Sequence, residues 1–304
     1  MQPINTYLRG GGLALKDFEF LSPTTTDEAA QIKAAAGNKA RVIAGGTDII
    51  VQLRGGRFEI DQLIDVKNIP ELNELSYSES DGLTIGAAVP CYKIYANSTV
   101  RSSYPSIVDC SELIGSIQIQ GRATLGGNLV NSSPSGDSLP TLIALNAIAV
   151  VKSTSGTRNI PIVEFFTGPG RNVMADNELL VSIKFPAPNK NSGAAFLRFI
   201  PRNEMDIAVA NVASYVTLSA DKKNFETVRI SIGAVGPTPY YAKDAGDLLA
   251  GQEVNDQNIL KAAEAAKVYA KPITDMRGTI EQRIHLVGVL TKRTLDIAIK
   301  RARG

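Results

Sequence analysis

The sequence predicts an α+β fold built from several units, and three observations support this prediction. The chain has 304 residues, and single hydrophobic cores stop growing near about 250–300 residues. In the first 188 residues, short strand patterns are interspersed with helical ones. After a polar linker at 189–193, the order changes to several strands followed by helices. We therefore expect two or three domains.

The first predicted unit covers residues 17–73 and follows an N-terminal extension of residues 1–16. The segment "FEFLSPTTTDEAAQIKAAAGNKA" predicts a short strand, a turn and an alanine-rich helix that ends at Gly37. The segment "ARVIAGGTDIIVQLRGG" adds a buried strand and a glycine pair, and "QLIDVKNI" adds a further strand. These patterns indicate a small unit of strands and a helix.

Residues 74–188 form the second predicted unit, in which strand signals and helical signals are mixed. A strand in "ELLVSIKFPAP" closes it, because Pro186 cannot donate a hydrogen bond to a sheet. The other expected elements are strands near 75–77, 83–87 and 147–151 and helices near 91–97, 106–113 and 141–145.

Residues 189–304 form the third predicted unit, a C-terminal α+β domain with a three-stranded antiparallel sheet. The strands are expected near 194–200, 207–218 and 227–235. Helical patterns follow in "DAGDLLAG" and "DQNILKAAEAAKVYA", and apolar residues recur at helical spacing in "TIEQRIHLVGVLTKRTLDIAIKRA".

Composition excludes several classes of function. A formal net charge of +2 is too small for a nucleic-acid partner, which needs many cationic contacts with phosphate. The two cysteines, Cys91 and Cys110, lie in no metal-binding motif, so this chain should hold neither an iron–sulfur cluster nor structural zinc. We find no signal peptide and no apolar run of about 18 residues. We therefore expect a cytoplasmic protein without a membrane span.

Two glycine-rich segments are the candidate binding motifs: "RVIAGGTDI" at 41–49 and "ATLGGNLVNSSPSGD" at 123–137. Each has a glycine pair, which lets a ligand approach the backbone, followed by small polar residues. Backbone N–H groups in such turns bind anions, so a diphosphate is the expected ligand. Neither segment matches the Rossmann or P-loop pattern, and either one alone is also typical of an ordinary turn.

The side chains of these motifs suit binding better than catalysis. We find no catalytic triad, acid–base dyad or metal-ligand cluster, so no catalytic residue and no metal ligand is predicted, and His285 is expected to be structural. Asp48 and Asp137 could accept hydrogen bonds from the hydroxyls of a sugar or ribityl chain. Further neutral donors are Thr47, Thr124, Asn128, Asn131 and Ser133.

Taken together, the motifs resemble a known family. "RVIAGGTDII", "SIQIQGRATLGGNLVNSSPSGDSLPTLIALNAIAVV", "LRFIPRNEMDIAVANVA", "AVGPTPYYAKDAGDLLAG" and "ITDMRGTIEQR" occur in this order. Over about residues 17–303 the chain is similar to the FAD-binding medium subunit of molybdenum hydroxylases. The resemblance implies a two-subdomain FAD-binding fold of the PCMH/VAO type over 17–73 and 74–188. A domain like the C-terminal domain of the carbon monoxide dehydrogenase flavoprotein should then cover 189–304.

The resemblance also implies a set of FAD-binding residues. The first motif and the second would enclose the diphosphate and the adjacent sugar, mainly through backbone amides. Asp137 matches an acidic residue that contacts the flavin, and Arg198 matches a basic residue, usually lysine, near the flavin ring. Ile114 and Gly115 fall where the family lines the isoalloxazine. The remaining residues are Val42, Ile43, Ala44, Gly45, Gly46, Thr47, Asp48, Ile49, Thr124, Leu125, Gly126, Gly127, Asn128 and Leu180.

The function implied by the resemblance is electron transfer within an oxidoreductase complex. FAD would be held in this chain, while [2Fe–2S] clusters and the molybdopterin cofactor would belong to a small and a large partner subunit, in a dimer of heterotrimers. The FAD would pass electrons from the clusters to an external acceptor. A free-standing flavin-dependent oxidoreductase is the alternative, and a nucleotide-binding module without electron transfer is a third hypothesis.

Overall fold

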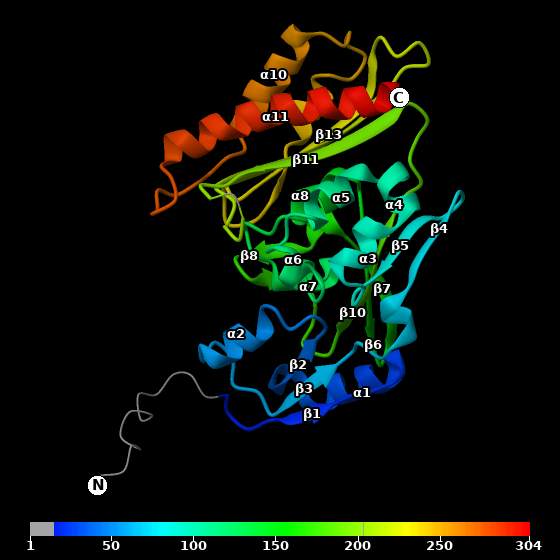
Figure 1. Ribbon diagram of the computed structural model, residues 1–304, viewed down its shortest axis with the longest axis vertical. Helices are drawn as coiled ribbons and strands as arrows, with labels where there is room; N and C mark the ends of the chain where they lie inside the picture. The colour runs from blue at the N-terminus through cyan, green and yellow to red at the C-terminus, as the bar shows by residue number, and fades with distance from the viewer. Residues whose placement is uncertain (1–14, 203) are drawn as a thin grey trace.

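The structure is a computed structural model that describes residues 15–202 and 204–304, so residues 1–14 of the predicted N-terminal extension lie outside the described residues. Three sheets follow one another along the long axis of the molecule (Figure 1). The first unit lies at the end nearest the N-terminus and the third at the end nearest the C-terminus. The predicted limits at residues 73 and 188 fall between these sheets and stay predictions.

The first unit is a three-stranded parallel sheet with the order β1-β3-β2. Helix α1 begins after Thr25, whose hydroxyl accepts a hydrogen bond from the N–H of Glu28, and it ends at Gly37 with φ 54°. A second, short helix follows the first glycine motif directly. The elements are β1 Glu19–Leu21, α1 Thr26–Ala36, β2 Ala40–Ile43, α2 Ile49–Arg54 and β3 Gln62–Asp65.

The second unit is a five-stranded antiparallel sheet with the order β4-β5-β10-β6-β7, with a cluster of short helices beside it (Figure 1). Its strands are β4 Leu75–Ser78, β5 Gly82–Gly86, β6 Ile148–Ser153, β7 Gly156–Pro161 and β10 Leu179–Phe185. Its helices are α3 Cys91–Ala96, α4 Ser98–Ser103, α5 Pro105–Ser111, α6 Ile117–Gln120, α7 Leu125–Asn131 and α8 Leu139–Ala144. A separate hairpin consists of β8 Phe166–Gly168 and β9 Arg171–Asn172.

The third unit has a four-stranded antiparallel sheet with the order β11-β12-β13-β14, one strand more than predicted. The extra strand has two residues, too few to show an alternating pattern in the sequence. The strands are β11 Ser192–Phe199, β12 Ala210–Leu218, β13 Phe225–Gly233 and β14 Tyr240–Tyr241. The helices are α9 Lys243–Asp247, α10 Asp256–Lys267 and α11 Ile280–Arg303.

Helix α11 lies across β11 and β12 (Figure 1). It packs closely because β11 carries Gly193, where an added Cβ would come within 2.2 Å of the carbonyl oxygen of Ala298. Apolar side chains of α11 itself, such as those of Val287, Leu290 and Leu295, are buried. None of the helices in the described residues is both long and apolar enough to cross a membrane.

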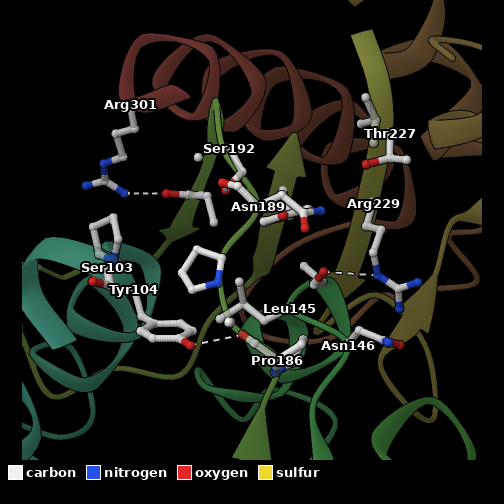
Figure 2. Close-up of a pocket in the computed structure, with 18 of the residues that line it drawn as sticks. Ser103, Tyr104, Leu145, Asn146, Pro186, Asn189, Ser192, Thr227, Arg229 and Arg301 are labelled. Atoms are coloured by element: carbon white, nitrogen blue, oxygen red, sulfur yellow. Dashed lines mark hydrogen bonds between the residues drawn. The ribbon is translucent and has the colours of Figure 1, made fainter. Parts of the chain in front are cut away.

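Two arginines of the third unit bind the second unit beside a cavity of about 600 Å³ (Figure 2). Arg301 of α11 donates to both carboxylate oxygens of Asp109, at 2.6 and 2.9 Å. Arg229 of β13 donates to the carbonyls of Ile143 and Ala144 at the end of α8, at 2.9 and 3.0 Å. On the wall of the same cavity, and within the second unit, Tyr104 donates to the carbonyl of Pro186 at 2.9 Å. The two arginines fix the third unit against the short helices of the second.

Candidate functional site

The two glycine motifs come together in a cleft of about 300 Å³ between the first and second units. The first motif reaches it from the turn between β2 and α2, and the second from the start of α7. Leu180 of β10 and Ile114, which precedes α6, lie along the same cleft. The predicted residues that line it are Val42, Ala44, Gly45, Gly46, Thr47, Asp48, Ile49, Ile114, Thr124, Gly126, Gly127, Asn128 and Leu180.

Side-chain hydrogen bonds connect the two motifs. Gln52 of α2 donates to Asn131 of α7 at 2.8 Å, and Asn131 donates in turn to Asp48 at 3.2 Å. Arg122 donates to the carbonyl of Gly45 at 3.3 Å. Segments about 80 residues apart in the sequence therefore form one site.

The first glycine of each pair permits the close approach of protein to protein. A Cβ at Gly45 would lie 2.0 Å from the carbonyl oxygen of Arg122, and one at Gly126 would lie 2.5 Å from that of Ala87. Gly46 instead needs its positive φ of 81°. Gly127 has only the hydroxyl of Thr124 nearby, at 3.1 Å from an added Cβ. Gly127 therefore has the fewest protein neighbours of the four glycines, and a side chain there would crowd the Thr124 hydroxyl that caps α7.

The backbone of the first motif fits an anionic ligand. Within the described residues, the amide groups of Gly46, Thr47 and Asp48 donate to no protein acceptor, although they line the cleft. Successive unpaired N–H groups in a turn form an anion-binding concavity. Burial raises the pKa of the Asp48 carboxyl, and the charge of Arg57 opposes this rise. These observations fit the diphosphate of FAD.

The polar side chains of the second motif stabilise the protein itself. The hydroxyl of Thr124 accepts from the N–H of Gly127 at 2.8 Å and caps α7. The side-chain oxygen of Asn128 accepts from the Ser138 hydroxyl at 2.6 Å. We expected these groups, with Asn131, to be donors for the ligand. In the structure these groups shape the loop that presents the backbone, and their predicted contacts with a ligand stay predictions.

Five of the predicted FAD-binding residues do not line the cleft, and neither does Ser133, one of the predicted donors. The side chains of Ile43 and Leu125 are buried in hydrophobic clusters on either side of it. Gly115, with φ 64°, is the turn that leads into α6. Asp137 and Arg198 form an ion pair with the carboxylate oxygen and Nη1 2.5 Å apart. The predicted flavin contacts of these five residues stay predictions.

The Asp137–Arg198 pair is buried where the loop before α8 meets β11. The side chains are 11% and 5% exposed, so neither charge is well solvated. Burial raises the pKa of Asp137 to about 7, and the Arg198 guanidinium opposes that rise. The second carboxylate oxygen of Asp137 and the Nε of Arg198 are buried and have no partner within the described part of the chain. The pair is therefore an incompletely satisfied polar cluster.

The cleft also has charged and aromatic walls that the motifs did not reveal. Arg41 of β2 and Phe58, beyond α2, come from the first unit, while Asp176, before β10, comes from the second. The other charged residues of the cleft that sequence reasoning missed are Lys33, Arg57 and Glu178. No local pattern identifies them, since folding alone brings them to one site.

Other polar features of the molecule are engaged elsewhere. The arginines around the larger cavity in Figure 2 already bind protein groups, so this cavity is a weaker candidate site. Burial raises the pKa of the Cys91 thiol to about 12 and that of Cys110 as well, so neither forms a reactive thiolate at neutral pH. No metal-binding group of three or more His, Cys, Asp or Glu side chains occurs in residues 15–202 and 204–304.

The chain matches two family models in succession. Residues 16–188 match the FAD binding domain in molybdopterin dehydrogenase, and residues 195–298 match the CO dehydrogenase flavoprotein C-terminal domain. It is 30% identical to the xanthine dehydrogenase FAD-binding subunit of Escherichia coli O157:H7, over 88% of this chain and 91% of the relative. It is 27% identical to the carbon monoxide dehydrogenase medium chain of Hydrogenophaga pseudoflava, over 92% and 96% of the two chains.

Solved structures agree with these matches. A chain of the carbon monoxide dehydrogenase from Hydrogenophaga pseudoflava superimposes with a TM-score of 0.90 at 27% identity, covering 95% of this chain and 99% of that one. A chain of quinoline 2-oxidoreductase from Pseudomonas putida 86 gives 0.88 at 25% identity, covering 96% and 100%. Since the first family model covers more than half of the residues, the chain belongs to the family of FAD-binding subunits of molybdenum hydroxylases, which are oxidoreductases.

Proposed function

We propose that this chain holds FAD in the cleft between its first two units and transfers electrons within a heteromeric molybdenum hydroxylase. The observation that carries the proposal is the convergence of both glycine motifs on that cleft, the first of them with unpaired amides. The flavin, when bound, supplies the electron-transfer chemistry. The residues of this chain bind and orient it.

We further propose that the chain functions between partner subunits. Two cysteines are too few for a four-cysteine [2Fe–2S] site. The clusters are therefore assigned to a small subunit and the molybdopterin cofactor to a large one, in a dimer of heterotrimers. Relatives named as a medium chain and as a subunit of a dehydrogenase complex support this assignment. Electrons then pass from the partner's clusters to an external acceptor. Both cysteines are free, which suits the reducing cytoplasm where we place the complex.

Flavin occupancy tests the binding site. The Gly127→Val substitution puts a branched side chain where the start of α7 lines the cleft, so we expect it to lower the FAD released on denaturation to a small fraction of the wild-type amount. Gly121→Val is the matched control, because a Cβ at Gly121 meets nothing within 4 Å and Gly121 does not line the cleft. Full flavin occupancy in a folded Gly127→Val protein would show that FAD does not contact the protein backbone at the start of α7.

Copurification tests the function. When the tagged chain is purified from its natural host, an untagged iron–sulfur protein and an untagged molybdopterin protein should copurify with it in equal amounts. A monomer that carries FAD and turns over a small substrate without these partners would instead support the free-standing oxidoreductase. A protein whose flavin cannot be photoreduced and reoxidised would support the nucleotide-binding module.

A further inference from the structure

The sheet of the third unit is covered on both faces. One face carries α11, and the other lies against α5 and α8 of the second unit (Figure 1). Three neighbours on adjacent strands form a row that faces the second unit: Arg198 on β11, Asn211 on β12 and Gly233 on β13. Val212, next to Asn211, points the other way into the apolar cluster under α11. The row therefore places a cation, an amide and a glycine against the start of α8.

Asn211 is a buried amide that the protein itself does not satisfy. Its side chain is fully buried, and neither its Nδ2 nor its Oδ1 has a hydrogen-bond partner within residues 15–202 and 204–304. A buried amide without partners costs free energy, and an apolar side chain of similar size would avoid that cost. Packing alone therefore does not explain an asparagine at this position.

Gly233 provides the space in which the Asn211 amide lies. A Cβ on Gly233 would come within 2.3 Å of the Oδ1 of Asn211 and 3.0 Å of the Cγ of Pro140 in α8. The nearest atom is the end of a side chain and not backbone, so a methyl group on Gly233 would displace the amide. The glycine therefore fixes where the amide of Asn211 lies.

The group on which the amide acts is the carboxyl of Asp137, which pairs with Arg198. Burial raises the pKa of Asp137 to about 7. Arg198 opposes this rise, and so does the Asn211 amide, from a position just outside hydrogen-bond geometry. The amide favours the carboxylate through its N–H groups, which are donors. The thiol of Cys110 in α5 also interacts with Asp137, but burial raises its pKa well above the ordinary value, so the thiol stays neutral.

We propose that Asn211 is a positioning residue that holds the Asp137 carboxyl against Arg198 and in its ionised form. The consequence for the flavin rests on the proposed function, since Asp137 is predicted to contact the flavin. An ionised Asp137 makes its pair with Arg198 neutral overall, whereas a protonated Asp137 leaves the positive charge of Arg198 uncompensated. A positive charge favours the uptake of electrons by a neighbouring group. Asn211 therefore keeps the reduction potential of a flavin beside this pair low.

The titration of Asp137 in the flavin-free full chain tests the positioning role. NMR of isotope-labelled aspartate carboxyls follows this titration, and Asp137→Asn identifies the signal by its loss. Asn211→Leu removes the donor at similar size, so we expect it to raise the midpoint of Asp137 by about one pH unit, a tenfold gain in proton affinity. Gly233→Ala should shift the midpoint in the same direction, although the nearest neighbours of its methyl group are Asn211 and Pro140.

Ser214→Ala is the matched control on the same strand. Ser214 is as buried as Asn211, but it lies 2.8 Å from the hydroxyl of Thr294 on the opposite face of the sheet. Its loss should leave the midpoint of Asp137 within about 0.2 pH unit of the wild-type value. An unchanged midpoint in both Asn211→Leu and Gly233→Ala overturns the positioning role, and so does an equal shift in Ser214→Ala. If Asn211→Leu does not fold, Gly233→Ala decides the result.

Potentiometry of the FAD-bound chain tests the consequence for the flavin. Between about pH 7 and 8, Asn211→Leu should have a more positive flavin potential than wild-type protein, because Asp137 is protonated to a greater extent in the variant. The difference should vanish at pH values above both midpoints. A shifted midpoint of Asp137 with equal potentials would overturn the effect on the flavin. A chain that shows the same shift but binds no FAD would overturn the proposed function and leave the positioning role of Asn211 in place.

Discussion

In each glycine motif the two neighbouring glycines have different surroundings. Gly45 and Gly126 face carbonyl groups of other segments, at distances that leave no room for a side chain. Gly46 is in a left-handed conformation, and Gly127 lines the cleft with only the Thr124 hydroxyl near an added Cβ. The first glycine of each pair therefore determines how closely the protein packs, while the second determines what the cleft can accept.

A substitution at Gly45 separates these two roles. A methyl group there would meet the Arg122 carbonyl, so we expect Gly45→Ala to lower the free energy of unfolding by about 1–3 kcal/mol, the usual cost of overpacking. Urea denaturation measures this loss. Gly121 precedes Arg122 in the sequence, and a Cβ there has no neighbour within 4 Å. Gly121→Ala should therefore change the free energy of unfolding by less than about 0.5 kcal/mol. Equal effects of the two substitutions would contradict the packing role.

At the scale of elements, strand β11 brings charge to the loop before α8. Arg198 lies on β11 opposite Asn211 of β12, and it pairs with Asp137 from the second unit. The pair is buried, and some of its polar atoms lack partners. A buried ion pair of this kind contributes little net stability, because the loss of solvation offsets the attraction. Because burial raises the pKa of Asp137 in the folded chain, the titration of this carboxyl should be visible in the pH dependence of stability.

The pKa of Asp137 sets the direction of that dependence. In the folded protein it is raised to about 7, whereas an unfolded aspartate titrates near about 3.9. The unfolded chain loses its proton first, so the contribution of Asp137 to stability falls as pH rises from about 4 to about 7 and is constant above. Asp137→Asn removes this titration. The free energy of unfolding of wild-type protein minus that of the variant should fall over this range.

Urea unfolding of the flavin-free chain at several pH values measures the difference. Asp221→Asn is a control with the opposite sign, because hydrogen bonds lower the pKa of Asp221, which is exposed, in the folded state. Wild-type protein should there lose stability relative to the variant as pH falls below about 4. A difference for Asp137→Asn that is constant from pH 4 to 7 would rule out the raised pKa.

At the scale of the whole molecule, the cleft lies between two sheets with separate topologies. One wall belongs to the parallel sheet of the first unit, and the other to the antiparallel sheet of the second and its helices. The side-chain bonds named above, such as the one from Gln52 to Asn131, join these walls. A ligand that contacts both walls should therefore hold the two units together.

This arrangement predicts that FAD stabilises the chain. With free FAD about 100-fold above its Kd, the free energy of unfolding should rise by about 2.7 kcal/mol, because the ligand binds the folded state alone. The shift of the urea midpoint on adding FAD measures this gain. Gly127→Val protein, in which the cleft is filled, should gain much less. The absence of any shift in wild-type protein would mean that the cleft does not hold FAD.

The sequence by itself determined most of the elements and the approximate place of the site. The long helix α11 and strands β11, β12 and β13 match their apolar patterns within a few residues, because these patterns repeat over many positions. Helix α7 was not predicted as a helix. Two glycines disfavour one, but the Thr124 cap and the packing of Gly126 on Ala87 overcome their low propensity. Short elements such as β14 leave no periodic pattern to detect.

Only the tertiary structure decided which groups meet in the cleft. Both glycine motifs could be identified as backbone binding segments because glycine has the same conformational freedom in any fold. Arg41, Arg57 and Phe58 carry no such local signal, since a cation or a ring acquires its role from what it faces. The same holds for Asn131, whose hydrogen-bonding partners Gln52 and Asp48 come from the first unit. The sequence shows which residue types each segment carries. Whether a buried polar group has a hydrogen-bond partner depends on contacts between distant segments, and these exist only after folding.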